Sequence, residues 1–140
     1  GRFLTGLNYW PNASSISMNY TVSGYIYYAY LFCYGHIGVY DSSANIAGGV
    51  MIDHATGVVI GETSKIDKNV SIYQGVTLGG RGFEIGDRHP KIKSGVSIFA
   101  SSTILGNIVI GKNAKIAAGS LVLKDVDEGV TVAGIPAKEI

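Results

Sequence analysis

Aliphatic residues recur, in most cases every six positions, from residue 46 to residue 122. They are Ile46, Ile52, Ile60, Ile66, Ile72, Leu78, Ile92, Ile98, Ile104, Ile110, Ile116 and Val122. Small or β-branched residues follow most of them four positions later, at Val50, Thr56, Ser64, Val70, Val76, Val96, Ser102, Ala114 and Ser120. This alternation indicates flat sides with aliphatic side chains pointing inward and small side chains near the corners, where bulk would not fit.

The twelve hexapeptides group into four coils of three. A coil that closes in about eighteen residues has no room for a crossover helix, so each face is buried by stacking on the next coil. The sequence therefore predicts an all-β fold, a parallel β-helix with three flat sides, from residue 46 to about residue 126.

The six-residue period is interrupted twice. Two extra residues lie between Ile52 and Ile60, and eight lie between Leu78 and Ile92. A solenoid that otherwise contains no extra residues rarely carries a loop without a use, so we expect the functional residues at these two interruptions.

Residues 1–45 have a different composition from the rest. They contain two formal charges, Arg2 and Asp41, and eight of the nine tyrosines. Residues 20–40 are uncharged apart from His36, but their Tyr, Gly, Ser and Asn content is too polar for a lipid-facing helix. We therefore expect a segment buried against the β-helix or another subunit, as a strand or a buried helix. The predicted division is a Tyr-rich segment over 1–45 and a β-helix domain over 46–140.

The overall charge and the cysteine content narrow the function. The net charge of +1, with 15% charged residues, predicts no basic face for nucleic acid and favours a small-molecule ligand. The single cysteine, Cys33, cannot form an intrachain disulfide, and no basic region precedes an apolar run as in a signal peptide. We expect a cytoplasmic protein.

Four segments carry a resemblance to a known family. They read Met-Ile-Asp-His-Ala-Thr-Gly-Val-Val-Ile-Gly-Glu over 51–62, Gly-Val-Thr-Leu-Gly-Gly over 75–80, Gly-Asp-Arg-His-Pro-Lys-Ile over 86–92 and Ala-Gly-Ile-Pro-Ala-Lys over 133–138. Together they resemble serine O-acetyltransferase of the hexapeptide-repeat acyltransferases, over roughly residues 44–138. The resemblance implies a left-handed coil, an exception to the usual right-handed crossover rule. It also implies transfer of an acetyl group from acetyl-CoA to the hydroxyl of L-serine, which gives O-acetylserine for cysteine biosynthesis, in a homotrimer or a dimer of trimers.

The first interruption carries the candidate catalytic residue. An alcohol is a poor nucleophile at neutral pH, so its proton must be removed as the oxygen attacks the thioester, and an imidazole suits this task. The resemblance makes His54 the general base and Asp53 the anchor for the amino group of serine. The structural alternatives are a corner histidine and an aspartate that caps backbone amides.

The second interruption carries the candidate carboxylate-binding residues. Arg88 offers a planar fork to a carboxylate and His89 a further donor, and both resemble the family residues that hold the amino-acid carboxylate. The alternative is that Arg88 pairs with Asp87 or Glu84 and only rigidifies the loop.

Coenzyme A requires a long groove, which in the resembling family runs between neighbouring subunits. The resemblance places Gly80, Ala100 and Ala118 along it, with Lys115 as a phosphate contact. The coil geometry requires the same small residues, so part of this signal is structural. Acetyl-CoA is expected as a co-substrate, and no metal is expected.

The sequence departs from the family in three respects. The aspartate that usually orients the catalytic histidine is replaced by Val39, and Asp41 lies two residues out of register, so His54 would lack its orienting partner. The long N-terminal helical domain of the family is absent from these 140 residues. Cysteine synthase is a partner of that family, but the tail that docks it is also absent here.

Other functions remain open at this point. One is a hexapeptide O-acetyltransferase that acts on a sugar or another amino acid. The others are a zinc-dependent enzyme like the β-helical carbonic anhydrases and an inactive scaffold. The histidines are His36, His54 and His89, and no closely spaced pair supplies two zinc ligands from one coil.

Overall fold

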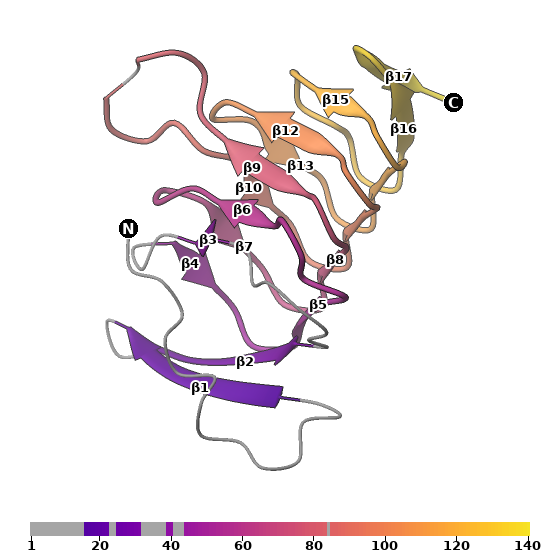
Figure 1. Cartoon of the computed structure of the whole chain (residues 1–140). Coiled ribbons are helices and arrows are strands. Elements are labelled where there is room, and N and C mark those ends of the chain that lie inside the picture. Colours follow the sequence, from indigo (N-terminus) through magenta and orange to yellow (C-terminus); the bar gives the residue numbers. More distant parts are fainter. Residues whose placement is uncertain (1–15, 23–24, 32–38, 41–43, 84) are drawn as a thin grey trace.

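The computed structural model describes residues 16–22, 25–31, 39–40, 44–83 and 85–140. In these residues the chain forms short strands joined by turns, without a helix. Figure 1 shows the strands stacked coil upon coil, with a hairpin at either end. Within the same residues no helix has the length and apolar character needed to cross a bilayer.

Each coil gives one strand to each of three parallel sheets. The first sheet contains β4 (Asn45–Ile46), β7 (Lys65–Ile66), β10 (Lys91–Ile92) and β13 (Val109–Ile110). The second contains β5 (Val50–Ile52), β8 (Ser71–Ile72), β11 (Ser97–Ile98) and β14 (Lys115–Ile116). The third contains β6 (Val59–Ile60), β9 (Thr77–Gly79), β12 (Thr103–Leu105) and β15 (Leu121–Val122). The four predicted coils are therefore present, and they wind left-handed as the resemblance implied.

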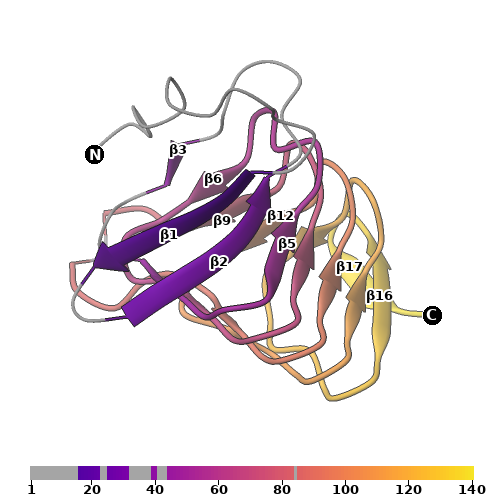
Figure 2. The ribbon, with the colours of Figure 1, turned by 90° about the horizontal axis from the view of Figure 1, so that it is seen from below.

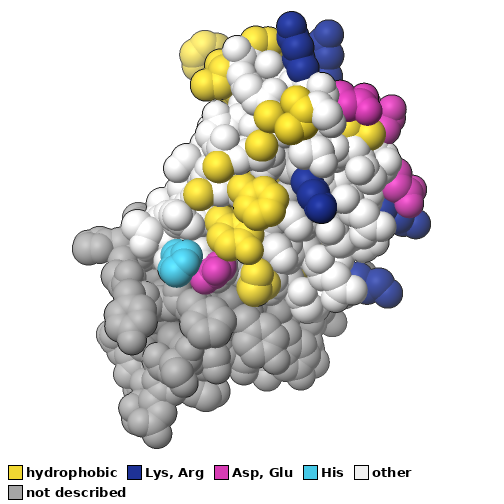
Figure 3. Space-filling model, turned by 90° about the vertical axis from the view of Figure 1, so that its right-hand side faces the viewer, with side chains coloured by type: hydrophobic (Ala, Val, Ile, Leu, Met, Phe, Trp, Pro, Cys, Tyr) yellow, Lys and Arg dark blue, Asp and Glu magenta, His cyan; other side chains and the backbone are white. Residues whose placement is uncertain are grey.

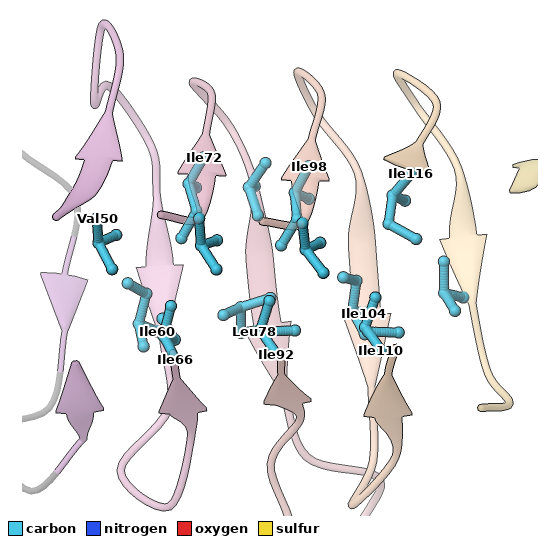
Figure 4. Close-up of a cluster of buried hydrophobic side chains, with 14 of the residues drawn as sticks. Val50, Ile60, Ile66, Ile72, Leu78, Ile92, Ile98, Ile104, Ile110 and Ile116 are labelled. Carbon is cyan, nitrogen blue, oxygen red and sulfur yellow. The ribbon is translucent and has the colours of Figure 1, made fainter. Parts of the chain in front are cut away.

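The repeat positions stack in exact register to form the core. In the second sheet Ile52 pairs with Ile72, which is in line with Ile98 and Ile116, and the other two sheets repeat this arrangement. Figure 4 shows the resulting columns of aliphatic side chains inside the coil. Of the predicted inward residues, Ile46 at the first coil is partly buried and the others are buried. Continuous apolar columns are the main stabilising contribution in such a fold.

One predicted corner position is wrong. Thr56 is exposed, whereas Ala55 and Val58 are buried at 2% and 4%. The two extra residues before Ile60 shift the phase of the repeat, so the residue four positions after Ile52 no longer points inward.

The described part of the Tyr-rich segment forms strands and continues two of the sheets. β1 (Ile16–Val22) and β2 (Tyr25–Leu31) form an antiparallel hairpin, and β2 pairs in parallel with β5. β3 (Val39–Tyr40) pairs in parallel with β6. Figure 2 shows this hairpin across the N-terminal end of the coil. The strand alternative for this segment is therefore the one observed, while Cys33, His36 and Asp41 lie outside the described residues.

The C-terminal end continues the coil beyond the predicted limit. Val126 forms a bridge with Ile110 of the first sheet, and β16 (Thr131–Gly134) pairs in parallel with β14 of the second. β17 (Ala137–Glu139) then turns back on β16 as an antiparallel strand. The coil therefore continues into a partial fifth turn, which covers the last complete one.

The core columns predict the effect of removing one side chain. Ile98 is fully buried between Ile72 and Ile116, so Ile98→Ala would leave a cavity that the rigid rungs cannot close. We expect a loss of about 2–5 kcal/mol in the free energy of unfolding, measured by urea denaturation. The control Val109→Ala, at a side chain that is 39% exposed, should change it by less than about 1 kcal/mol. Equal effects of the two variants would contradict this assignment of the core.

Candidate functional site

The first interruption forms a strained turn between β5 and β6. His54 and Ala55 have φ angles of 61° and 55°, in the left-handed region that residues other than glycine rarely adopt. The turn is held by the Thr56 N–H, which donates to the His54 carbonyl at 2.7 Å, and by the Gly75 N–H, which donates to the Thr56 carbonyl at 2.8 Å. Ala55 points into the core, while the His54 side chain is 67% exposed. Strained backbone of this kind often marks a functional site, and here it presents an imidazole outward.

Asp53 lies beside His54 at the same corner. Its Oδ1 is 3.7 Å from Nε2 of His54, which is within ion-pair range but too long for a hydrogen bond. The Asp53 side chain is 27% exposed, so both groups reach the surface. A carboxylate at this place can bind an ammonium group or stabilise a protonated imidazole.

Two aromatic rings continue the surface next to Asp53. Tyr73 and Phe99 follow β8 and β11 on the two rungs after that of Asp53, and their rings stack with centroids 5.4 Å apart. Figure 3 shows a histidine and an acidic side chain next to each other on one face, with hydrophobic side chains beside them. An apolar wall therefore borders the candidate base. The sequence reasoning did not identify this pair, although an aromatic residue where other repeats carry a small or acidic one was a usable signal.

The second interruption is a loop at a different corner. It leaves β9 in the third sheet and returns at β10 in the first sheet. Near its start, Arg81 donates from Nε to the Leu105 carbonyl at 3.2 Å and from Nη2 to the Leu123 carbonyl. Farther along, Phe83 and Ile85 are fully exposed. The base of the loop is thus anchored to the later coils, and its apolar side chains point to solvent.

The returning end of the loop is bound to the turn that follows β6. Thr63 Oγ1 accepts hydrogen bonds from the backbone N–H groups of Arg88 at 3.0 Å and His89 at 3.1 Å. The same oxygen is 2.8 Å from Nδ1 of His89, and the Thr63 N–H donates to that nitrogen at 3.2 Å. One threonine therefore binds two successive loop residues, both of them predicted site residues.

His89 is buried, with 6% of its surface exposed. Its ring lies directly on Gly61, where an added Cβ would be 2.1 Å from the ring carbon Cδ2 and 2.2 Å from Nε2. Nδ1 faces Thr63. The predicted contact with a substrate carboxylate would therefore be made by the other ring nitrogen, Nε2. The predicted role of His89 as a donor thus depends on this one atom.

Arg88 forms an ion pair with Glu62, with Nη2 and Oε1 2.8 Å apart. Its side chain also lies across Gly80, where an added Cβ would be 3.0 Å from Cδ of Arg88. The sequence analysis considered Asp87 or Glu84 as the partner. Asp87 instead pairs with Lys91, and Glu84 lies outside the described residues.

Lys91 forms hydrogen bonds that link the returning end of the loop to the turn after β6. Its ammonium group donates to Asp87 Oδ1 and to the His89 carbonyl, both at 2.5 Å, and to the Thr63 carbonyl at 3.0 Å. These three acceptors match the three N–H bonds of an ammonium group. The hydrogen bond from Lys91 holds the pKa of Asp87 below its ordinary value.

The predicted site residues fall into two groups on one chain. Ala100 and Ala118 follow β11 and β14 and so share the corner of His54, with Lys115 exposed on β14 nearby. Gly80 lies instead at the loop corner with Arg88. The third sheet separates the two corners, and Figure 1 shows the loop on the side of the molecule away from β5 and β8. A single chain therefore does not bring His54 and Arg88 together.

No metal site is formed by the described residues, where no group of three or more His, Cys, Asp or Glu side chains could hold an ion. His54 and His89 lie at the two separate corners, and His36 lies outside the described residues.

Comparisons with known proteins find the same hexapeptide repeat and the same family that the sequence motifs resemble. The family model described as bacterial transferase hexapeptide (six repeats) matches residues 89–124. Serine acetyltransferase of Haemophilus influenzae is 60% identical over 96 residues, which are 69% of this chain and 36% of that protein. Serine acetyltransferase 2 of Arabidopsis thaliana is 61% identical over 98 residues, which are 70% of this chain and 30% of that protein. The chain thus spans about a third of the length of these curated relatives.

Solved structures give the same result. A serine acetyltransferase in complex with cysteine has a TM-score of 0.73 and 56% identity, covering 74% of this chain and 43% of that chain. The enzyme from Brucella abortus in complex with coenzyme A has a TM-score of 0.73 and 55% identity, covering 74% and 41%. The chain is therefore similar to the hexapeptide-repeat transferases in sequence and in fold. Within that class it is similar to the serine acetyltransferases.

Replacing the central ammonium of the loop end should destabilise the protein. Lys91→Met keeps the apolar part of the side chain but leaves three acceptors without their donor. We expect a loss of about 1–3 kcal/mol in the free energy of unfolding, measured by urea denaturation. The control Lys93→Met, at an exposed lysine two residues away, should change it by less than about 0.5 kcal/mol. A Lys91→Met protein as stable as Lys93→Met would refute the role given to Lys91.

The same contact predicts a pH dependence. Because the pKa of Asp87 is lower in the folded loop than in the unfolded chain, its contribution to stability is present above the unfolded pKa. That contribution is lost as the pH falls through the folded pKa. An NMR titration of the Asp87 carboxyl carbon should show the lowered pKa in the wild type and a return toward the ordinary value in Lys91→Met. Identical titration curves would show that Lys91 is not the cause.

Proposed function

We propose that this protein transfers the acetyl group of acetyl-CoA to the hydroxyl of L-serine, as a step of cysteine biosynthesis in the cytoplasm. The observation that carries the proposal is the exposed imidazole of His54 on a strained turn, with the Asp53 carboxylate 3.7 Å from Nε2. The similarity to serine acetyltransferases supports the choice of acceptor, since one such neighbour, from Neisseria gonorrhoeae, has its structure in complex with serine.

In this mechanism His54 acts as the general base. Its imidazole takes the hydroxyl proton as the serine oxygen attacks the thioester carbonyl, and the C–S bond then breaks to release coenzyme A. The imidazolium returns the proton to the leaving thiolate, so no net proton remains on the enzyme. Asp53 binds the ammonium group of serine and favours the imidazolium as it forms.

Arg88 and His89 bind the serine carboxylate in this proposal. The guanidinium of Arg88 contacts Glu62 through Nη2, and a planar fork of five N–H donors can bind a second carboxylate as well. Because these residues lie at a different corner from His54, the complete site requires the loop of a second copy. A head-to-tail contact that closes into a ring, such as the trimer expected from the resemblance, supplies both halves at every interface.

Coenzyme A binds along the same interface in this proposal. Ala100 and Ala118 lie at the corner of His54 and leave room for the pantetheine chain, while Gly80 comes from the loop corner of the neighbouring copy. Lys115 contacts the phosphates. The relative from Brucella abortus has its structure in complex with coenzyme A.

The activity is tested by thiol release from acetyl-CoA with L-serine and a panel of other hydroxyl acceptors, including sugars. We expect release with serine. His54→Asn should lower kcat by about 10²–10⁴-fold, and the fold should be kept because asparagine tolerates the left-handed conformation. Arg88→Ala should raise KM for serine but not affect an acceptor without a carboxylate. Thiol release with sugars alone, or undiminished turnover by His54→Asn, would overturn the proposal.

The shared site is tested by mixing two impaired variants and assaying them at a serine concentration far below the raised KM of Arg88→Ala, where both have little activity. His54→Asn and Arg88→Ala are refolded together in equal amounts, so that copies combine at random. One interface in four then unites an intact His54 with an intact Arg88, and about a quarter of the wild-type activity should return. The same variants assayed without mixing are the control. No recovery would show that both residues act within one chain.

A further inference from the structure

We infer that Thr63 is a positioning residue that holds Arg88 and His89 in place and fixes the proton of His89 on Nε2. The inference rests on the proposed function, because these two residues are the proposed carboxylate ligands. It concerns the turn Gly61–Thr63, which the sequence analysis did not connect with the loop.

The hydrogen bonds of Thr63 determine the tautomer of His89. A hydroxyl group has one donor and two acceptor positions. Both acceptor positions of Thr63 Oγ1 are used, by the N–H groups of Arg88 at 3.0 Å and His89 at 3.1 Å. Its hydrogen is therefore left to donate, and the nitrogen Nδ1 of His89 lies 2.8 Å away. The Asp87 carboxyl, whose pKa is lowered by Lys91 and also by the Thr63 hydroxyl, competes for the same hydrogen. The Thr63 N–H donates to Nδ1 of His89 at 3.2 Å.

A ring nitrogen that accepts hydrogen bonds carries no proton, so the proton of the neutral imidazole lies on Nε2. His89 then presents a fixed N–H donor rather than a mixture of two tautomers. A fixed donor binds an anionic oxygen without first reorganising, which lowers the free energy lost on binding. The hydroxyl of Thr63 thus affects the binding of the serine substrate through His89, without contacting that substrate itself.

The two residues before Thr63 complete the support. Gly61 has no side chain, so the imidazole lies close against it, and any Cβ would occupy the place of the ring. Glu62 pairs with Arg88 through a 2.8 Å contact. Three consecutive residues therefore contact the two loop residues in three different ways, and Thr63 is the one that contacts both.

The test compares Thr63→Val with Thr63→Ser. Valine keeps the shape but removes the hydroxyl, whereas serine keeps it. In the wild type, the ¹⁵N chemical shifts of His89 should show the proton on Nε2. In Thr63→Val only the backbone N–H still donates to Nδ1, so the fraction of His89 with its proton on Nε2 should fall. The KM for serine should rise by about 10–100-fold with less than about a threefold change in kcat. Thr63→Ser should restore both readouts, and the control Thr103→Val, on the outward side of β12, should change neither.

Several results would overturn the inference. A proton on Nδ1 of His89 in the wild type would do so, as would a Thr63→Val protein with unchanged shifts and unchanged KM. If Thr63→Val does not fold, Gly61→Ala provides the second variant, since its methyl group displaces the ring while Thr63 keeps its hydroxyl. Unchanged ¹⁵N shifts of His89 and an unchanged KM in Gly61→Ala would then refute the described position of the His89 ring against Gly61. Absence of turnover by the wild type would refute the proposed function alone, because the ¹⁵N shifts need no substrate.

Discussion

The in-register stacking of aliphatic side chains is the constraint on which the other features depend. Each rung is hydrogen-bonded to the next at a spacing of about 4.8 Å, and the interior columns prevent any rung from sliding or turning over. The residue that follows each inward aliphatic residue is placed just as firmly on the outside. Asp53, Tyr73 and Phe99 form such an outer column because Ile52, Ile72 and Ile98 form the inner one. The fold thus acts as a rigid frame, in which the register of the core also fixes the positions of the outward side chains.

The predicted base His54 and the predicted carboxylate ligand Arg88 both lie where the regularity of this frame is broken. Two extra residues suffice at the corner of His54, where consecutive left-handed φ angles turn one side chain outward and the next inward. The larger insertion needs its own supports, which Thr63, Glu62 and Lys91 provide. The two interruptions are separated by a flat side, so in the proposed reaction each chain would supply two separate halves of the site. Association of copies is then a requirement of the geometry for the proposed reaction, rather than an addition to it.

The period of six was sufficient to predict the sheets and the inward residues, because interior packing follows directly from the repeat. It also located His54 and Arg88 at the interruptions. The contacts of the loop could not be predicted in the same way. Thr63 and His89 are 26 residues apart, and only the return path of the loop brings them together. For the same reason the alternative considered for Arg88 was a pair with Asp87 or Glu84, which are near it in sequence. Asp87 pairs with Lys91 instead, and Arg88 forms an ion pair with Glu62 from the preceding coil. Local composition indicates which groups are available, but pairing across coils is decided by the stacking.

In the proposed assembly, the interaction between His54 and Asp53 would also depend on a second copy. In one chain the imidazole is 67% exposed, and water screens its attraction to Asp53 at 3.7 Å, so the pair contributes little in that state. The interaction of two such charges grows severalfold when water is replaced by protein. A neighbouring loop that covers this corner would remove water from both groups and bring in the guanidinium of Arg88. With valine at position 39, where the family resemblance led us to expect an aspartate, the Asp53 carboxylate is the described acid beside His54. The same burial that completes the acceptor site would therefore also strengthen the support for the imidazolium during proton transfer.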